Sequence, residues 1–194
     1  AAAWFPVNAV GFVFHPPSPR CVDPEHARDL VDGLPLSAKK VGVFVDQSPE
    51  EIRWVAETVG LDMLQVYRPE QAAALKGFLP LIKAFRVAEG ADLHRVDPPE
   101  EGSFILLDRR DVERPGGTGK AFDWNILECF PYLSRTLVAG GINAGNLPRL
   151  LNTVQPRGID LSSGIESAPG IKSVSKMNAV MTIIEEYRHA TTAR

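Results

Sequence analysis

Two glycines follow an apolar run in the segment LVAGGINAGNL (137–147). Glycine lacks the Cβ atom that would keep a ligand away from main-chain N–H groups. A helical pattern begins directly after the pair, and the first N–H groups of a helix, with its positive dipole end, favour an anion. Gly140 and Gly141 are therefore candidates for binding a phosphate. The alternative is a structural turn in which Asn143 caps the following helix.

A second segment with the same chemistry follows the next apolar run, in GIDLSSGIE (158–166). Ser162, Ser163 and Gly164 offer hydroxyl and main-chain N–H donors, which suit phosphate oxygens. We predict that the two loops hold one phosphate from two sides.

One carboxyl group stands at the end of an apolar run, Asp108 in SFILLD (103–108). Desolvation there would raise its pKa and let it keep a proton near neutral pH, as a general acid requires. The alternative is a cap, but no helical pattern follows Asp108 directly.

Short apolar runs with β-forming residues recur along the chain, and each is followed by a polar loop. We predict seven strands, at 9–14, 40–45, 62–67, 79–85, 103–108, 136–141 and 158–163. Helix signals separate most of them: Asp23 precedes Pro24, and Ser48, Pro49 and Glu51 form a capping box. We predict helices over 23–31, 48–60, 123–130, 143–154 and 173–190.

This strand and helix alternation indicates parallel strands buried on both faces. The two candidate architectures are an open doubly wound sheet and a (β/α)8 barrel. A doubly wound sheet gathers its chemistry at one switch point, whereas a barrel brings all strand ends to one mouth. Polar residues follow nearly every predicted strand, so we expect an α/β fold with a (β/α)8 TIM barrel, in which residues 1–194 form a single domain.

Composition limits the classes of partner. With 194 residues, 44% hydrophobic residues and a net charge of −3, the chain fits one globular domain without a basic patch for nucleic acid. No run is long enough to span a membrane, and the first residues lack a signal-peptide pattern, so we expect a cytoplasmic protein. Cys21 and Cys129 give neither a disulfide framework nor a zinc motif. We expect a small-molecule partner and no metal.

Six segments in this order resemble phosphoribosylanthranilate isomerases of tryptophan biosynthesis: GFVFHPPSPR, VGVFVDQSPEEI, IKAFR, PGGTGKAFDW, LVAGGINAGNL and GIDLSSGIESAPGIK. The resemblance implies a (β/α)8 barrel that carries out an Amadori rearrangement of N-(5′-phosphoribosyl)anthranilate, a phosphosugar, without metal or organic cofactor. It also implies a monomer or a homodimer.

The resemblance assigns roles to three side chains. Asp108 corresponds to the general acid, and Arg20 to the arginine that holds the anthranilate carboxylate, a task that suits a planar fork of donors. Asp160 corresponds to an aspartate beside the substrate, although an ion pair with Lys83 or another barrel charge is an alternative. In GGTGK (116–120), Gly116, Gly117 and Gly119 lack the spacing of a nucleotide-binding loop, and we predict a flap over the substrate.

The sequence departs from the family in two places. Family members begin with a strand that carries a Lys-Ile-Cys-Gly motif, whose cysteine is the general base, and the printed residues begin after it. Seven of the eight strands are therefore visible, and we expect an upstream strand with this cysteine, without which residues 1–194 would be inactive and prone to aggregate. Tyr67 and Arg68 stand where the family usually has His-Gly.

Three alternatives to this isomerase follow. One is a non-catalytic phosphosugar-binding barrel that has lost the cysteine. An indoleglycerol-phosphate synthase and a ribulose-phosphate epimerase are the others, but the longer chain and lysine chemistry of the first and the metal-binding histidines of the second have no match here.

Overall fold

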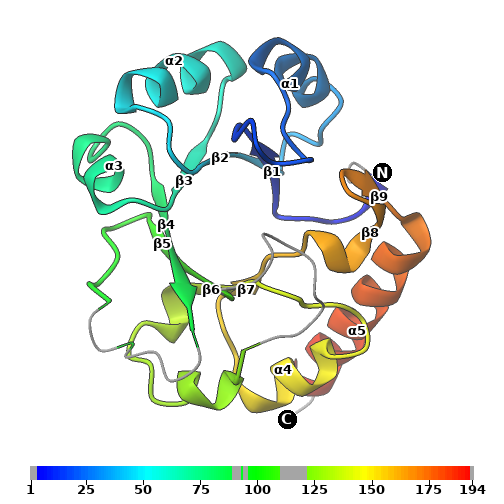
Figure 1. Cartoon of the computed structure of the whole chain (residues 1–194). Coiled ribbons are helices and arrows are strands. Elements are labelled where there is room, and N and C mark those ends of the chain that lie inside the picture. The colour runs from blue at the N-terminus through cyan, green and yellow to red at the C-terminus, as the bar shows by residue number, and fades with distance from the viewer. Residues whose placement is uncertain (1–3, 89–92, 94–95, 110–121, 193–194) are drawn as a thin grey trace. The chain divides into compact units, whose positions relative to one another are not determined.

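The computed structural model describes residues 4–88, 93, 96–109 and 122–192 (Figure 1). The chain divides into two compact units, one formed by residues 1–84 and 100–104 and the other by residues 85–99 and 105–194. In each unit, parallel strands are separated along the chain by helices, as the sequence pattern predicts.

The first unit is built on parallel strands that follow one another in chain order. These strands are β1 (Ala9–Val13), β2 (Lys39–Phe44), β3 (Met63–Val66) and β4 (Leu81–Val87), whose last residues belong to the second unit. The helices that follow the first three strands are α1 (Pro24–Val31), α2 (Pro49–Val59) and α3 (Pro69–Ala74). Figure 1 shows these helices on the same side of the strands.

Two of these helices begin where their capping residues predict. The Asp23 carboxylate accepts a hydrogen bond from the N–H of His26 at 2.9 Å, and Ser48 Oγ accepts one from the N–H of Glu51 at 3.2 Å. Such bonds satisfy N–H groups that have no partner inside the helix. Helix α2 ends at Gly60, whose φ of +70° is the left-handed conformation that glycine adopts without strain.

The core of the first unit lies between these strands and helices. Phe14, just after β1, stacks on Phe44 of β2 with ring centroids 5.3 Å apart. Ile52 of α2, Leu64 of β3 and Leu81 of β4 are fully buried in the same cluster. Because this packing fixes the strands, it also fixes the loops that follow them.

The second unit contains parallel strands in the order β5 (Phe104–Arg109), whose first residue belongs to the first unit, β6 (Thr136–Val138) and β7 (Gly158–Ile159). In β5, Ile105, Leu106 and Leu107 are buried in succession, as expected for a strand covered on both faces. Helices α4 (Leu147–Thr153) and α5 (Val174–Thr192) contact each other. Between β7 and α5 lie the 3₁₀ turn η5 (Ser163–Ile165) and a hairpin of β8 (Glu166–Ala168) and β9 (Ile171–Lys172).

All seven predicted strands are present, and the differences concern their ends and three other segments. Strand β6 stops at Val138 because the chain turns at Gly140 and Gly141, whose φ angles are +86° and +71°. The helix predicted over 123–130 is a short 3₁₀ helix, η3 (Trp124–Leu127), which Asp123 caps. The sequence analysis did not predict α3 or the β8–β9 hairpin.

Candidate active site

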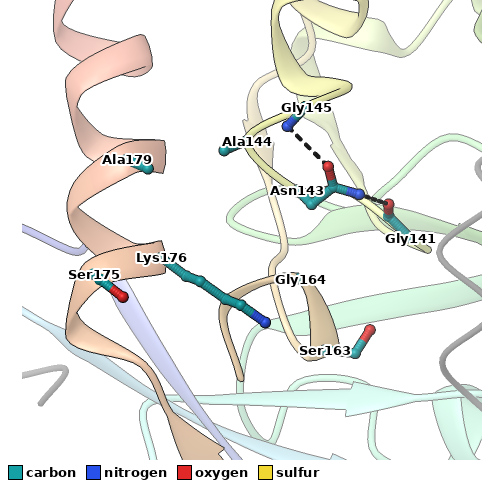
Figure 2. Close-up of a pocket in the computed structure, with 9 residues that line it drawn as sticks. All are labelled: Gly141, Asn143, Ala144, Gly145, Ser163, Gly164, Ser175, Lys176 and Ala179. Atoms are coloured by element: carbon teal, nitrogen blue, oxygen red, sulfur yellow. Dashed lines mark hydrogen bonds between the residues drawn. The ribbon is translucent and has the colours of Figure 1, made fainter. Parts of the chain in front are cut away.

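The loops after β6 and β7 line one open pocket of about 520 Å³ (Figure 2). Gly141 comes from the first loop, and Ser163 and Gly164 come from the second, so three of the residues predicted to bind phosphate lie together. The remaining lining residues are Asn143, Ala144, Gly145, Ser175, Lys176 and Ala179. Gly140 and Ser162 directly precede lining residues in the sequence.

The first loop is held by two asparagines rather than by a capped helix end. Asn143 Oδ1 accepts a hydrogen bond from the N–H of Gly145 at 2.9 Å, and Asn146 Oδ1 accepts one from the N–H of Asn143 at 2.9 Å. Both amide groups donate to the carbonyl oxygen of Gly141, at 3.1 and 2.9 Å. The alternative in which Asn143 caps the helix is wrong, because α4 begins at Leu147 and Asn146 precedes it.

Three main-chain donors of this loop are left for a ligand. Within the described residues, the N–H groups of Gly141, Ile142 and Ala144 donate no hydrogen bond to protein. Since a phosphate oxygen accepts hydrogen bonds from such groups, the loop has the chemistry that the two glycines predict.

Asp108 is the penultimate residue of β5, half-buried at the carboxyl end of the strand. A Cβ on Gly140 would lie 3.0 Å from Asp108 Oδ1 and 2.6 Å from the main-chain nitrogen of Arg109. Gly140 therefore leaves room for the carboxylate beside the loop of the pocket. The structure thus places the predicted acid next to the predicted phosphate loop, and the raised pKa of Asp108 stays a prediction.

Asp160 directly follows β7, and its N–H donates to the carbonyl oxygen of Val138 at 2.9 Å. Desolvation by surrounding protein raises the pKa of its carboxyl group although the side chain keeps contact with solvent, whereas the Lys172 ammonium and the N–H of Leu161 lower it. The cation near Asp160 is Lys172, while Lys83 Nζ lies 3.8 Å from Glu100.

The sequence analysis missed a pair of charges under the second loop. Glu166 of β8 and Lys172 of β9 are cross-strand partners, and Lys172 Nζ donates to Glu166 Oε1 at 2.8 Å. The same ammonium lies 3.5 Å from the carbonyl oxygen of Ser162. Lys176 Nζ donates to the carbonyl oxygen of Glu166 at 2.6 Å. The signal in the sequence is the Pro169-Gly170 turn, which folds the lysines back toward Glu166.

Arg20 belongs to the first unit, in the loop after β1, where its guanidinium-bearing side chain is half-buried. Two turns shape this loop: the N–H of Ser18 donates to the carbonyl oxygen of His15 at 2.9 Å, and the N–H of Cys21 donates to the carbonyl oxygen of Ser18 at 3.0 Å.

Desolvation and the nearby Asp23 carboxylate raise the pKa of the Cys21 thiol. The raised pKa disfavours the thiolate that a general base would need.

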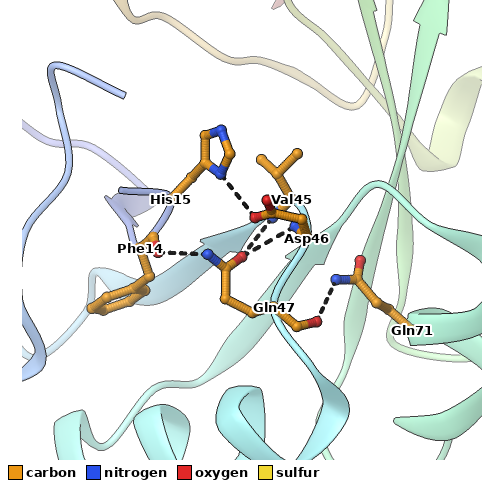
Figure 3. A network of polar contacts seen from close by, with 6 residues as sticks. All are labelled: Phe14, His15, Val45, Asp46, Gln47 and Gln71. Atoms are coloured by element: carbon orange, nitrogen blue, oxygen red, sulfur yellow. Dashed lines mark hydrogen bonds and ion pairs between the residues drawn. The ribbon is translucent and has the colours of Figure 1, made fainter. Parts of the chain in front are cut away.

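A polar network joins the loops after β1 and β2 (Figure 3). His15 Nδ1 lies 2.9 Å from Asp46 Oδ1. Gln47 is buried, and its amide donates to the carbonyl oxygen of Phe14 at 2.9 Å while its Oε1 accepts from the N–H of Val45 at 2.9 Å. Gln71 Nε2 donates to the carbonyl oxygen of Gln47 at 2.9 Å. The sequence analysis predicted polar residues after these strands but not the contacts between them.

Two further segments were singled out in the sequence. The predicted flap glycines, Gly116, Gly117 and Gly119, lie outside the described residues. Tyr67 Oη accepts a hydrogen bond from Gln65 Nε2 at 3.1 Å, and Arg68 occupies the capping position of α3. Within the described residues, no group of three or more histidine, cysteine or carboxylate side chains is placed to hold a metal ion.

The described helices include none with the length and apolar character needed to cross a membrane.

Comparison with known proteins identifies the family of this chain. The model of the family described as N-(5′-phosphoribosyl)anthranilate isomerase matches residues 1–182. The chain belongs to this isomerase family. A family member from Pseudomonas putida (strain W619) is 40% identical over 189 residues, covering 96% of this chain and 91% of that protein. A family member from Syntrophus aciditrophicus is 38% identical over 187 residues, covering 93% of this chain and 79% of that protein.

Solved structures of family members have the same fold. The phosphoribosyl anthranilate isomerase of Thermus thermophilus is 36% identical, with a TM-score of 0.80 over 92% of this chain and 88% of that one. Another isomerase structure, in complex with reduced 1-(o-carboxyphenylamino)-1-deoxyribulose 5-phosphate, is 32% identical, with a TM-score of 0.76 over the same shares. The predicted α/β class and TIM-barrel architecture are thereby confirmed.

Proposed function

We propose that this protein converts N-(5′-phosphoribosyl)anthranilate into 1-(2-carboxyphenylamino)-1-deoxyribulose 5-phosphate, as an isomerase of tryptophan biosynthesis. The observation that carries the proposal is the position of Asp108 beside Gly140. The next residue, Gly141, lines the pocket together with Ser163 and Gly164. The reaction requires a general acid and a binding site for the substrate phosphate, and these strand ends offer candidates for both. A solved relative was crystallised with a reduced 5-phosphate product analogue.

Asp108 acts as the general acid in this proposal. Its proton goes to the furanose ring oxygen as the bond between that oxygen and C1′ breaks, and the anthranilate nitrogen supplies the electron pair that forms the protonated Schiff base. A base then removes the C2′ proton, and the resulting enolamine tautomerises to the ketone. The family resemblance assigns this base to the cysteine of the Lys-Ile-Cys-Gly motif of family members.

The remaining residues hold the substrate at its two anionic ends. Arg20 binds the anthranilate carboxylate through its planar fork, and Gly140, Gly141, Ser162, Ser163 and Gly164 form the phosphate loops. Asp160, which directly follows β7, faces the substrate in this proposal and accepts a hydrogen bond from a ribose hydroxyl group. None of these contacts requires a metal ion or an organic cofactor.

The state of assembly and the location follow from the same chemistry. A related structure from Thermotoga maritima is described as monomers generated from a dimeric isomerase, and we propose a monomer or a homodimer here. Because a phosphorylated substrate does not cross a bilayer unaided, the enzyme works in the compartment that makes its substrate, the cytoplasm.

A non-catalytic phosphosugar-binding protein is the alternative, and it is not favoured, because the relatives of this chain are named as isomerases. An assay distinguishes the isomerase from the non-catalytic binding protein: the full-length protein is incubated with phosphoribosylanthranilate, and the loss of substrate fluorescence is followed. Turnover with formation of the carboxyphenylamino-deoxyribulose phosphate supports the proposal. Binding of the substrate without turnover would support the alternative.

A further inference from the structure

Lys176 brings a positive charge into the pocket formed by the loops after β6 and β7. It lies in the first turns of α5, and Figure 2 shows its side chain extending from the helix toward Gly164 and Ser163. It is also the one ionisable residue among the residues that line the pocket in the described part of the chain. No carboxylate of the lining offsets this charge.

The ammonium of Lys176 is anchored but not neutralised. Its hydrogen bond goes to the main-chain oxygen of Glu166, at 2.6 Å, and not to the carboxylate of that residue. The Glu166 carboxylate, only 4% exposed, is instead bound by Lys172 Nζ at 2.8 Å. Lys172 thus pairs with the buried acid, and the ammonium of Lys176 is left facing the pocket.

The donor capacity of Lys176 also exceeds what the protein uses. An ammonium group has three N–H donors, and one of them is directed at the Glu166 carbonyl oxygen. In the described residues, Lys176 Nζ has no other hydrogen-bond partner and no carboxylate partner. Two donors therefore remain for a ligand in the pocket.

The opposite wall of the pocket offers donors of the matching kind. The N–H groups of Gly141 and Ala144 donate no hydrogen bond to described protein atoms, and both residues line the pocket. Main-chain donors on one side and a cation on the other suit a small anion with several acceptor oxygens.

We propose that Lys176 binds the phosphate of the substrate directly, from the side of α5, and that the Lys172–Glu166 pair keeps its ammonium available for this contact. The inference rests on the proposed function, since the ligand is the terminal phosphate monoester of that substrate. It assigns to a side chain part of a site that the sequence assigned only to glycines and serines.

The first test is the binding of inorganic phosphate to the full-length protein by calorimetry. Lys176→Met keeps the aliphatic part of the side chain and removes the charge, and we expect it to raise the Kd for phosphate about tenfold. Lys176→Arg, which keeps the charge, should stay within about threefold of the wild type. Lys39→Met is the control, because Lys39 is exposed in the first unit, and it should leave phosphate binding unchanged.

A second measurement separates ligand binding from a merely structural role. The reduced product analogue is titrated with and without its 5-phosphate into each variant. Lys176→Met should weaken only the phosphorylated analogue and should raise KM while leaving kcat nearly unchanged. Equal loss for both analogues, or an unchanged Kd for inorganic phosphate, would overturn the inference.

The outcome for Lys176 is independent of the isomerase activity. If the wild-type protein fails to turn over phosphoribosylanthranilate but Lys176→Met weakens phosphate binding, the proposed function fails and the contact stands. If the wild type turns over its substrate and Lys176→Met keeps wild-type phosphate affinity and KM, the contact is wrong and the function stands.

Discussion

Gly164 packs against the main-chain carbonyl group of Ile142 with no room for a side chain, since a Cβ at position 164 would overlap the Ile142 oxygen. This contact joins the loop after β7 to the loop after β6. It explains why a glycine follows the two serines.

Gly164→Ala should therefore push the two loops apart. We expect KM for the phosphorylated substrate to rise about tenfold or more and the melting temperature to fall, because overpacking a contact of this kind costs about 1–3 kcal/mol. Gly33→Ala in the first unit is the matched control, since a Cβ there would be 3.6 Å from its nearest neighbour. A Gly164→Ala protein with wild-type KM would show that the loop contact does not shape the site.

Arg20→Ala should weaken binding of the reduced product analogue by a factor of about 10 to 100, because a hydrogen-bonded pair with a charged group contributes about 1.5–3 kcal/mol. Calorimetry with the analogue measures this change. An analogue without the anthranilate carboxylate is the control, and its affinity should be the same for Arg20→Ala and the wild type. If the complete analogue also binds both proteins equally, Arg20 is a loop charge outside the site.

Gln47→Ala should lower the free energy of unfolding by about 1–3 kcal/mol, the usual effect of leaving buried polar groups without partners. The substitution removes the amide that bonds the Phe14 oxygen and the Val45 N–H in the loops after β1 and β2. Urea denaturation measures the change, with the exposed Gln155→Ala as the control. Equal stability of the two variants would mean that water replaces these bonds at no cost.

Asp160→Asn should stabilise the protein at neutral pH while it lowers activity. Desolvation by surrounding protein raises the pKa of Asp160 in the folded state, so the folded protein holds this proton to a higher pH than the unfolded chain. Stability contributed by this group is therefore present below its unfolded pKa and declines as pH rises through its folded pKa. Between pH 3.5 and 7.5, the melting temperature of Asp160→Asn minus that of the wild type should therefore increase with pH. Parallel curves for variant and wild type would contradict the assignment.

Much of the fold could be predicted because it depends on local patterns. Apolar runs placed β1 to β7, and Asp23 and Ser48 marked two helix starts through bonds to residues three positions away. Asp108 and Gly141 could be proposed as site residues because a single segment shows that the first ends an apolar run and that the second, a glycine, has no side chain. The predicted ends of β6 and β7 were too late because the sequence pattern of a strand continues beyond the last residue that pairs with a neighbouring strand.

The contacts that the sequence did not predict join residues without a periodic relation. His15 and Asp46 are 31 positions apart and meet because β1 and β2 are neighbours in register. Lys176 reaches the pocket because the hairpin of β8 and β9 returns the chain to the loop it left. The alternative in which Asn143 caps the helix came from its residue type before a helical pattern. In the structure its side chain accepts a hydrogen bond from the main-chain N–H two residues on, as side chains in turns also do.

The role of Asp108 is the central claim about the chemistry, and Asp108→Asn in the full-length protein tests it most directly. The amide keeps the shape of the side chain but has no proton to transfer to the ring oxygen. We predict that kcat falls by a factor of about 100 to 10,000, measured as loss of phosphoribosylanthranilate fluorescence, while the reduced product analogue binds with nearly wild-type affinity and the melting temperature is unchanged. Turnover within a few-fold of the wild type, with the exposed Glu128→Gln as control, would contradict the assignment of Asp108 as the general acid.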